Sequence, residues 1–430
     1  MHRSMFPDYP DRCGWNAMLP KRRPNPSASG KISARYAVVG AGFTGLAAAR
    51  RLHELDPTAE IVVLEATTVG EGSSARNSGF LTPADIAGSV DPAAIDRNVA
   101  RNRYVQEGFD WLLDLITRHG IACDLVEAGR IKAAATAAGE GAVRDLLAVV
   151  KALGIAHVLL DRERLGERIG SDYYRLGLFT EVGHLVQPAA LIRGLAEALP
   201  AAIKLYERSP VLSLARQGRW LLETADARIE VDTVIMATNS AIKSFGYLRD
   251  RLVTIYTYAA ITEAMTAADS ARLGAMASWG LLPAHRLGTT LRRVGPDRLM
   301  VRSLYAYEQG VTPEFARAEL TDRFRRRYPE LAHVGIEHVW GGTTALTMNG
   351  APFWGRIDER LYASAGCNGS GIVKGTVLGK RLAESIIGHA GGDDLVAAYG
   401  TANWIAPEPL RTIGFNVVSA IERRKAGLES

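Results

Sequence analysis

The feature that most constrains this chain of 430 residues is a glycine-rich turn placed between a short apolar run and a helical pattern. The run 36–39 is followed at once by Gly40-Ala-Gly42-Phe-Thr-Gly45, and small and apolar residues then recur at helical spacing. A second apolar run, 61–64, ends at Glu65, which stands 20 residues after Gly45. This order of strand, turn, helix, strand and acid predicts a Rossmann-type site for a dinucleotide.

Each position of this motif has a physical task. Gly40 permits the tight turn, Gly42 lets the backbone approach a pyrophosphate, and Gly45 lets the helix lie close to the strand. The positive end of the helix then faces the diphosphate, and Glu65 accepts hydrogen bonds from the adenosine ribose while disfavouring a 2′-phosphate. The motif alone leaves NAD and FAD open. The predicted cofactor contacts of this turn are Gly40, Gly42, Phe43, Thr44, Gly45 and Glu65.

The loop after the acid favours a flavin cofactor. Residues 66–80 are small and hydroxyl-rich and carry one guanidinium, where a typical nicotinamide enzyme would enter its next helix or strand. Free backbone N–H groups, hydroxyls and an arginine can wrap the second half of an extended cofactor, near the diphosphate or the ribityl chain. A flexible surface linker is the alternative. The predicted contacts are Ala66, Gly72, Ser73, Ser74, Arg76, Asn77, Ser78 and Gly79.

Four stretches of the chain together resemble the FAD-dependent oxidoreductases of the D-amino-acid oxidase superfamily, which contains the glycine and sarcosine oxidases. They are VVGAGFTGLAAAR, LEATTVGEGSSARNSGF, VDTVIMATNS and LYASAGCNGSGIVKGTVLGKRLAESIIG, and they occur in the family's order over about residues 35–430. The form Ser-Ala-Arg-Asn-Ser-Gly at 74–79 is most similar to the γ-glutamylputrescine oxidase branch.

This resemblance implies a second set of cofactor contacts, far from the first in sequence. A buried strand ends at Ala-Thr-Asn beneath the adenine side, and the C-terminal glycine loop opens a helix whose positive end faces the reduced flavin. Because loop 73–79 has no His or Cys and Cys367 is better interpreted as a packed thiol, we expect noncovalent FAD. The residues implied are Val211, Ala237, Thr238, Asn239, Gly366, Asn368, Gly369, Gly371 and Ile372.

The expected fold class is α/β, with a Rossmann-type FAD-binding domain and a second, mixed-sheet substrate domain. Residues 1–34 are expected to form an N-terminal arm on the domain surface. The FAD-binding domain is then discontinuous, because its glycine loops lie at opposite ends of the chain. Its segments are 35–84, 156–245 and 339–430, and those of the substrate domain are 85–155, with helical spacing, and 246–338, with strand alternation.

Aromatic and basic side chains of the strand-like segments are the candidates for the substrate side. Aromatic walls bind apolar or cationic parts of an amine, and in related amino-acid oxidases an arginine pairs with the substrate carboxylate. Core packing is the alternative for each aromatic residue, and a solvent-facing position for each arginine. The predicted catalytic residues are Arg302, Trp340 and Tyr256, and the predicted substrate contacts are Tyr258, Trp279, Arg292, Tyr305 and Lys374, with Tyr307 in the same aromatic set.

One departure from the family pattern concerns Lys374. Sarcosine-oxidase-type members have a lysine two positions after the last glycine of the C-terminal motif. Here that position is Val373, and Lys374 is turned about 100° further around a helix. A simple α-amino acid is therefore in doubt as substrate.

The predicted activity is oxidation of a carbon–nitrogen bond, with hydride transfer to FAD, hydrolysis of the imine to an aldehyde or oxo acid, and transfer of electrons to O2 to give hydrogen peroxide. A γ-glutamylated amine or polyamine is the first candidate for the small-molecule substrate. The alternatives are a glycine-like or D-amino-acid-like oxidase, a dehydrogenase that uses a quinone or carrier, and a flavin- or NAD-binding protein of another kind.

Composition excludes several other classes of protein. The net charge of +5 is spread along the chain, and the run at 323–327 is interpreted as a solvated helix face, so no nucleic-acid partner is expected. No apolar stretch reaches the roughly 18–20 residues of a membrane span, and no metal-ligand spacing is present. Three scattered cysteines and the lack of a signal-like apolar segment favour the cytoplasm. The oligomeric state stays open.

Overall fold

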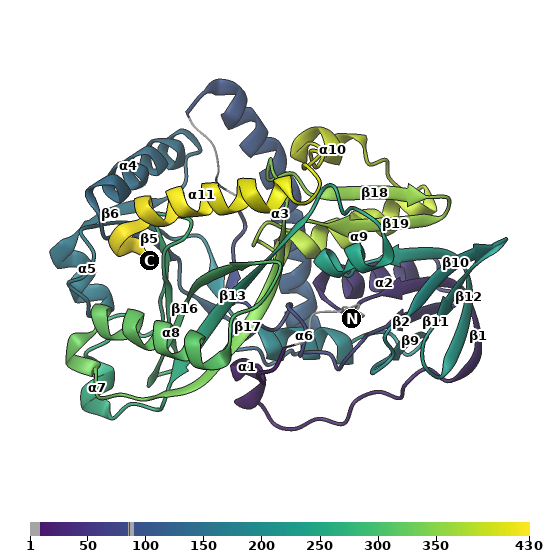
Figure 1. Cartoon of the computed structure of the whole chain (residues 1–430), viewed down its shortest axis with the longest axis horizontal. Helices are drawn as coiled ribbons and strands as arrows, with labels where there is room; N and C mark the ends of the chain where they lie inside the picture. The colour runs from purple at the N-terminus through teal and green to yellow at the C-terminus, as the bar shows by residue number, and fades with distance from the viewer. Residues whose placement is uncertain (1–8, 85, 87–89) are drawn as a thin grey trace.

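The computed structural model describes residues 9–84, 86 and 90–430 of the chain. Its first sheet is of the Rossmann type and contains five parallel strands (Figure 1). The apolar runs predicted from the sequence form β1 and β2, which pair in parallel over Tyr36–Val39 and Ile61–Leu64. The parallel strands are β1 (Gly30–Val39), β2 (Ile61–Leu64), β9 (Ile203–Tyr206), β12 (Ala227–Met236) and β19 (Leu361–Ala365), and the antiparallel ones are β10 (Ser213–Gln217), β11 (Arg219–Glu223) and β18 (Phe353–Asp358).

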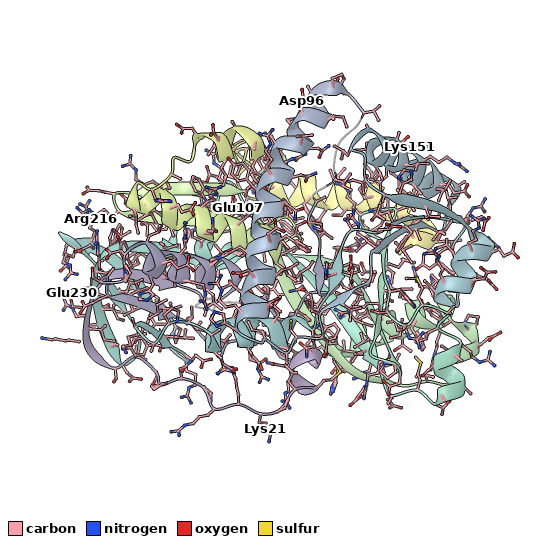
Figure 2. The ribbon with its side chains drawn as sticks, turned by 180° about the vertical axis from the view of Figure 1, so that it is seen from behind. Lys21, Asp96, Glu107, Lys151, Arg216 and Glu230 are labelled. Carbon is pink, nitrogen blue, oxygen red and sulfur yellow. The ribbon has the colours of Figure 1, made fainter. Side chains whose placement is uncertain are left out.

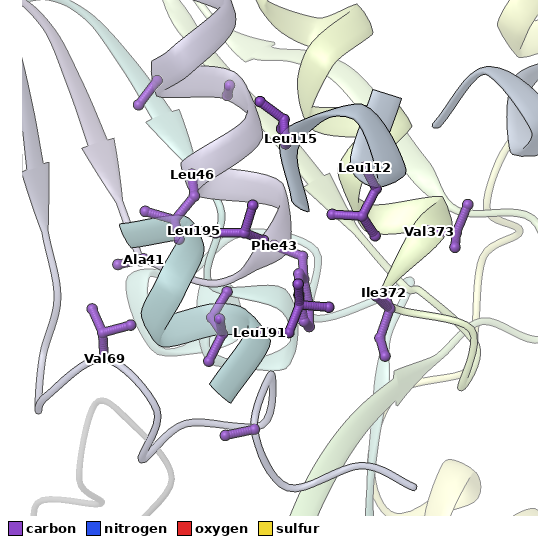
Figure 3. Close-up of a cluster of buried hydrophobic side chains, with 14 of the residues drawn as sticks. Ala41, Phe43, Leu46, Val69, Leu112, Leu115, Leu191, Leu195, Ile372 and Val373 are labelled. Atoms are coloured by element: carbon purple, nitrogen blue, oxygen red, sulfur yellow. The ribbon is translucent and has the colours of Figure 1, made fainter. Parts of the chain in front are cut away.

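The helices on one side of this sheet form an apolar core directly beside the glycine turns (Figure 3). Phe43 and Leu46 of α2 lie in this core with Leu112 of α3 and with Ile372 and Val373, where α9 begins. The two glycine-containing helices therefore share one hydrophobic cluster, although they are over 300 residues apart. The bounds are α2 (Phe43–Leu55), α3 (Pro92–Arg118), α6 (Pro188–Glu197) and α9 (Val373–Ile387).

Charged groups tie α3 to α9 on the outside of this core. Glu107, on the back of the molecule in Figure 2, accepts hydrogen bonds from Lys380 at 2.5 Å and from Arg381 at 3.1 Å. The same two cations and Arg51 of α2 surround Glu384, whose pKa is lowered by these partners against the effect of burial.

The second sheet is mixed and faces the first across the molecule's centre. Its order is β17-β13-β16-β15-β14-β5-β7-β6. Helix α8 (Pro313–Arg327) covers one face with Ala316, Leu320 and Phe324. The strands are β5 (Arg130–Ala134), β6 (His157–Asp161), β7 (Leu176–Thr180), β13 (Val253–Thr262), β14 (Gly280–Pro283), β15 (Thr290–Val294), β16 (Arg298–Tyr307) and β17 (Ile336–Leu346).

The remaining elements connect and cover these two layers. Helix α11 crosses over the second sheet (Figure 1), where the ring of Phe415 stacks on that of Tyr307 with centroids 4.3 Å apart. A small sheet of β3 (Phe80–Leu81), β8 (His184–Leu185) and β4 (Val126–Glu127) lies between the layers. The other helices are α1 (Gly14–Ala17), α4 (Ala137–Ala152), α5 (Arg162–Ile169), α7 (Ala267–Ala271), α10 (Asp393–Tyr399) and α11 (Leu410–Ala426), with short 3-10 turns η1 (Asn239–Phe245), η2 (Pro329–Leu331) and η3 (Gly427–Glu429).

The expected fold class is confirmed, but strand pairing differs from the expected segment boundaries. β6 and β7 belong to the second sheet, although 156–245 was assigned to the first domain. β17 and the end of the chain also lie with the second sheet, although 339–430 was assigned to the first. Local composition does not reveal these memberships, because long-range hydrogen bonding decides them. Among the described residues, no helix combines the length and apolarity that a membrane crossing requires.

Candidate active site

A cavity of about 810 Å³ lies between the two sheets, and both glycine turns line it. Gly40 and Gly42 border it from the first turn, and Gly369 and Gly371 border it from the second. The segments that were predicted to converge on one ligand therefore do meet at one cavity. Its volume falls within the range of small-molecule and cofactor sites, roughly 300–1,000 Å³.

The first turn is shaped by close backbone contacts. Gly40 has a φ of +101°, and a Cβ there would lie 2.8 Å from the carbonyl oxygen of Ala237. A Cβ on Gly45 would lie 3.1 Å from the carbonyl carbon of Gly40 and closer still to its oxygen. Only glycine fits these two positions, and the result is that α2 begins against the end of β1 with its N-terminus at the cavity.

Glu65 lies at the end of β2 and lines the same cavity. Its carboxylate accepts hydrogen bonds from the backbone N–H of Ala41 at 3.0 Å and of Thr67 at 3.1 Å. Burial raises its pKa, while these hydrogen bonds and the Thr67 hydroxyl act in the opposite direction. The acid is thus fixed beside the first turn, where the motif predicts the hydroxyls of the adenosine ribose.

The loop that follows Glu65 is held from three sides. Arg76 donates hydrogen bonds to the carbonyl oxygens of Glu71 at 2.7 Å, of Gly341 in β17 at 2.9 Å and of Asp11 in the arm at 2.9 Å. Ser74 Oγ reaches the N–H of Phe43 at 3.4 Å, so the loop also meets the start of α2. Arg76 therefore shapes the loop by bonding to protein carbonyls, in addition to lining the cavity.

The second glycine turn joins β19 to α9. The N–H of Gly366 donates to Asn239 Oδ1 at 3.0 Å, and the Cys367 thiol lies 3.4 Å from Thr344 Oγ1 and 3.6 Å from Asn239 Nδ2. Asn368 has a φ of +52° and bonds to the backbone around it rather than facing the cavity.

Most of the predicted cofactor residues line the main cavity, and three do not. Gly45, Gly366 and Asn368 lie behind its wall, where they set the backbone paths just described. The residues on the cavity wall are Gly40, Gly42, Phe43, Thr44, Glu65, Ala66, Gly72, Ser73, Ser74, Arg76, Asn77, Ser78, Gly79, Val211, Ala237, Thr238, Asn239, Gly369, Gly371 and Ile372.

The second sheet contributes the opposite wall of the main cavity. Arg302 and Thr290 are neighbours on β16 and β15, and both line it. The Arg302 guanidinium lies 5.6 Å from the centroid of the Tyr305 ring, and the described residues offer it no hydrogen bond or ion pair. Lys374, in the first turn of α9, is 5% exposed and also lines the cavity.

Four other residues predicted for the substrate side lie inside the protein. Trp279 is fully buried in the second core and donates to the carbonyl of Leu273. The hydroxyl of Tyr258 accepts from the N–H of Val311, and Trp340 is fully buried and donates to the carbonyl of Arg76. None of them reaches the main cavity, so direct substrate contact does not fit their positions.

Arg292 is the fourth, and its position suggests a different role. Its Nη1 donates to the carbonyl oxygens of Ser78 at 2.9 Å and Val186 at 2.5 Å. Burial lowers its pKa to about 10, so it remains a cation at neutral pH. Arg292 therefore holds loop 66–79, called the flavin-side loop below, from behind instead of binding a substrate carboxylate.

Tyr256, Tyr305 and Tyr307 line a second, more open cavity of about 1830 Å³ beneath α11. Ser240 and Ala241 border both cavities, so the two adjoin at η1. Arg302 and Tyr305 lie on opposite sides of the boundary and contact each other.

Several residues that line the main cavity were not predicted from the sequence. Thr257, Leu282 and Arg130 line it from the second sheet, Thr343 and Thr344 from β17, and Tyr9, Asp11 and Arg12 from the arm. Strand alternation would have placed Thr257 on the face of β13 opposite Tyr256 and Tyr258. The signal in the arm is the pair Cys13 and Trp15, two apolar side chains in a polar segment, both fully buried.

Residues 35–385 match the family described as FAD dependent oxidoreductase. The chain belongs to this family. It is 26% identical over 399 residues to a probable oxidoreductase OrdL of Rhizobium meliloti, with 91% of each chain covered. It is also 26% identical over 377 residues to the gamma-glutamylputrescine oxidoreductase of Escherichia coli, covering 86% of this chain and 87% of the relative.

Solved structures of other proteins share the fold. Glycine oxidase from Geobacillus kaustophilus superposes with a TM-score of 0.70 at 19% identity, covering 86% of this chain and 99% of that one. L-proline dehydrogenase from P. horikoshii gives 0.68 at 17% identity, covering 89% and 100%. The resemblance to the D-amino-acid oxidase superfamily is thus confirmed, and the protein is an FAD-dependent oxidoreductase.

The residues present fit FAD. A Cβ on Gly42 would lie 2.7 Å from Ser74 Oγ, so the cradle between turn and loop depends on glycine. Thr238 Oγ1 is buried on the cavity wall and has no hydrogen-bond partner in the described part of the chain, which leaves it for a ligand. In the described ranges, no group of side chains has the composition of a metal site.

Proposed function

We propose that this chain oxidises the carbon–nitrogen bond of an amine that also carries a carboxylate, with a γ-glutamylated amine as the first candidate. The observation that supports this is the charge of the second-sheet wall. Among the described residues, that wall contributes Arg130 and Arg302 and no acidic side chain to the main cavity. The Arg302 guanidinium has no hydrogen bond or ion pair to the described residues, so it is suited to bidentate pairing with a carboxylate.

The two walls of the cavity would have different roles, the first-sheet side for the cofactor and the second-sheet side for the substrate. FAD, when bound, supplies a two-electron acceptor for the hydride on the carbon next to nitrogen. The first turn, Glu65 and loop 66–79 would hold its nucleotide and diphosphate half, and the positive end of α9 would stabilise negative charge on its redox-active half. Arg302 would fix the substrate's carboxylate, and Leu282 excludes water from the same wall.

The proposed overall reaction balances with oxygen as acceptor. A primary amine, O2 and water give an aldehyde, ammonia and hydrogen peroxide. An α-amino acid gives the corresponding oxo acid instead of the aldehyde. No general base is needed from the chain if the amine binds in its neutral form. A cytoplasmic location is part of the proposal.

The relative from E. coli supports the γ-glutamyl assignment by its name, and the position of Lys374 is compatible with it. Lys374 lies on the cavity wall in the first turn of α9, one position beyond the lysine of sarcosine-oxidase-type members. A second candidate is an amino-acid oxidase or dehydrogenase, favoured by the same Arg302, since an α-carboxylate would suit it equally.

The test compares matched substrates in the presence and absence of oxygen. Anaerobic bleaching of the flavin band near about 450 nm ranks a panel of γ-glutamylated diamines, free diamines and amino acids. Aerobic peroxide formation then separates an oxidase from a dehydrogenase. We expect a γ-glutamylated diamine to bleach the flavin fastest, and a panel led by glycine or proline would favour the second candidate.

Arg302→Met tests the carboxylate contact. Loss of a charged hydrogen bond costs roughly 1.5–3 kcal/mol, so kcat/KM for the carboxylate-bearing substrate should fall about 10- to 100-fold. Turnover of a carboxylate-free amine and the FAD content should not change. Arg228→Met, an exposed strand arginine at the far end of β12, is the matched control. An equal loss for both substrates would contradict the assignment.

A further inference from the structure

The N-terminal arm is built into the wall of the main cavity. Tyr9, Pro10, Asp11 and Arg12 all line it, together with residues of the first sheet and of β17. The arm then continues through α1 and runs along the outside of the molecule, past Lys21 (Figure 2), to β1. The Rossmann motif does not need this segment, because the motif begins only with β1.

We propose that residues 9–16 of the arm are a working part of the FAD site, and that Tyr9 is a positioning residue that holds the flavin-side loop closed over the cofactor. This inference rests on FAD binding in the main cavity and does not depend on which amine is oxidised.

Side chains of the arm contact three carbonyl groups of the loop. Trp15 Nε1 donates to the carbonyl of Asn77 at 2.8 Å, and Asn16 Nδ2 donates to that of Gly70 at 2.9 Å. The Cys13 thiol contacts the carbonyl of Ala75 at 3.5 Å. These contacts fix three carbonyl groups of the loop from the side of the arm.

Trp15 anchors this arrangement. It is fully buried, its ring meets Trp340 edge-on with centroids 5.9 Å apart, and the Arg292 guanidinium lies 5.0 Å from its centroid. Gln187 Nε2 donates to its carbonyl at 2.7 Å. Trp15 thus packs between β17 and the arginine that holds the loop at Ser78.

The hydroxyl groups of Tyr9, Ser73 and Thr343 form a hydrogen-bonded triangle in the cavity wall. Its hydroxyl lies 2.8 Å from Ser73 Oγ and 2.8 Å from Thr343 Oγ1, and these two lie 2.9 Å from each other. Arg76 covers the Tyr9 ring, with its guanidinium carbon 4.1 Å from the centroid. The hydroxyl triangle joins the arm, the loop and β17, and all three residues line the main cavity.

A second attachment holds the arm farther from the cavity. Glu207, fully buried, pairs with Arg22 and accepts hydrogen bonds from the N–H groups of Val69 and Asn25. This attachment keeps the arm on the protein when the Tyr9 contacts are removed, so point changes at Tyr9 probe the cavity wall without releasing the whole segment.

The experiment measures FAD binding to apoprotein by flavin fluorescence, quenching of bound flavin by iodide, and the thermal stability of the apoprotein. Tyr9→Phe removes one hydroxyl, and we expect FAD affinity to fall about 3- to 10-fold with unchanged apoprotein Tm. Tyr9→Ala should weaken it further and increase quenching by iodide. Tyr247→Phe is the control and should match the wild type, because Tyr247 lines neither cavity and its hydroxyl has no hydrogen bond to the described residues.

The shared triangle gives a second measurement. Thr343→Val should weaken FAD binding to a similar extent, and the double variant with Tyr9→Phe should lose less than the product of the two single effects, because both break one network. Unchanged affinity and quenching in Tyr9→Phe and Tyr9→Ala would overturn the proposal while leaving FAD binding intact. A wild-type protein that does not bind FAD at all would instead overturn the cofactor assignment itself.

Discussion

The contact between α2 and α9 offers a direct test of how the two halves of the FAD site are held together. A Cβ on Gly379 of α9 would lie 2.9 Å from the carbonyl carbon of Thr44 and 3.0 Å from its Cα, and closer still to its oxygen. Ordinary van der Waals contact begins near 3.4 Å, so Gly379→Ala forces the two helix backbones apart. Neither backbone can rotate away as a side chain would.

The magnitude follows from two opposing terms. Overpacking in a well-packed core costs about 1–3 kcal/mol, and a backbone contact belongs at the upper end. Alanine in place of a helical glycine returns about 1 kcal/mol of propensity. The net destabilisation should therefore be about 1–2 kcal/mol. Because the N-termini of both helices line the cavity, FAD affinity should fall roughly tenfold, the equivalent of about 1.4 kcal/mol.

The matched control is Gly414→Ala in α11, a helical glycine with no atom within 4 Å of its would-be Cβ. It should gain up to about 1 kcal/mol. Urea unfolding of the two apoproteins and FAD titration of both provide the comparison. Equal free energies of unfolding for the two variants would refute the argument that the backbones of α2 and α9 are too close to admit a Cβ at Gly379.

Two further predictions concern the second sheet. Burial lowers the pKa of Lys132 to about 8, so between pH 8 and about 10.5 the unfolded chain binds a proton that the folded chain does not, and stability rises with pH across that window. Lys132→Met should therefore raise the free energy of unfolding by about 1–3 kcal/mol at pH 7. Urea denaturation at pH 10 should show most of this difference from the wild type gone. A difference that does not depend on pH would contradict the burial argument. Trp279→Ala should cost about 3–5 kcal/mol of unfolding free energy with the FAD affinity of the folded protein unchanged, and a large change in that affinity would show that Trp279 reaches the site.

The dinucleotide half of the site could be predicted because its requirements are local. The turn, the helix and the acid are fixed by backbone geometry over 30 residues, so glycine spacing carries the information directly. The second glycine turn has a weaker local signal. Its placement beside the first depends on β19 pairing with β12, a contact that only the family resemblance supplied.

The residues of the second sheet that line the cavity were predicted less well. The prediction chose aromatic residues, whereas the alternation of side chains along each strand decides which of them face the cavity. Tyr256 and Tyr258 share one face of β13, and Thr257 between them faces the main cavity. On β16, Leu304 has a φ of +60°, and the pairing register shifts opposite it, between Thr257 and Tyr258. That irregularity breaks the alternation beyond Arg302, and no residue type in the sequence announces it.

The prediction from the arginine run was also wrong for one residue. The run at 323–327 was expected to be a solvated helix face, but Arg327 is 1% exposed and donates to Tyr174 and to the carbonyl of Glu429. The last residues of the chain supply these acceptors. A sequence pattern within one helix cannot show that a segment 100 residues away will cover it.

The loop at 66–79 is where these separate observations combine. Arg292 holds its Ser78 carbonyl from the second sheet, Trp15 holds its Asn77 carbonyl from the arm, and Arg76 ties it to β17. Burying a cation such as Arg292 is costly unless its hydrogen bonds fix something that must not move. The same β-sheet also presents Arg302 to the cavity, so one sheet would both shape the cofactor loop and, on the proposed function, position the substrate. A change that displaces the second sheet should therefore disturb the binding of FAD and of the substrate together, because the loop is anchored to that sheet by Arg292 and by Gly341 of β17.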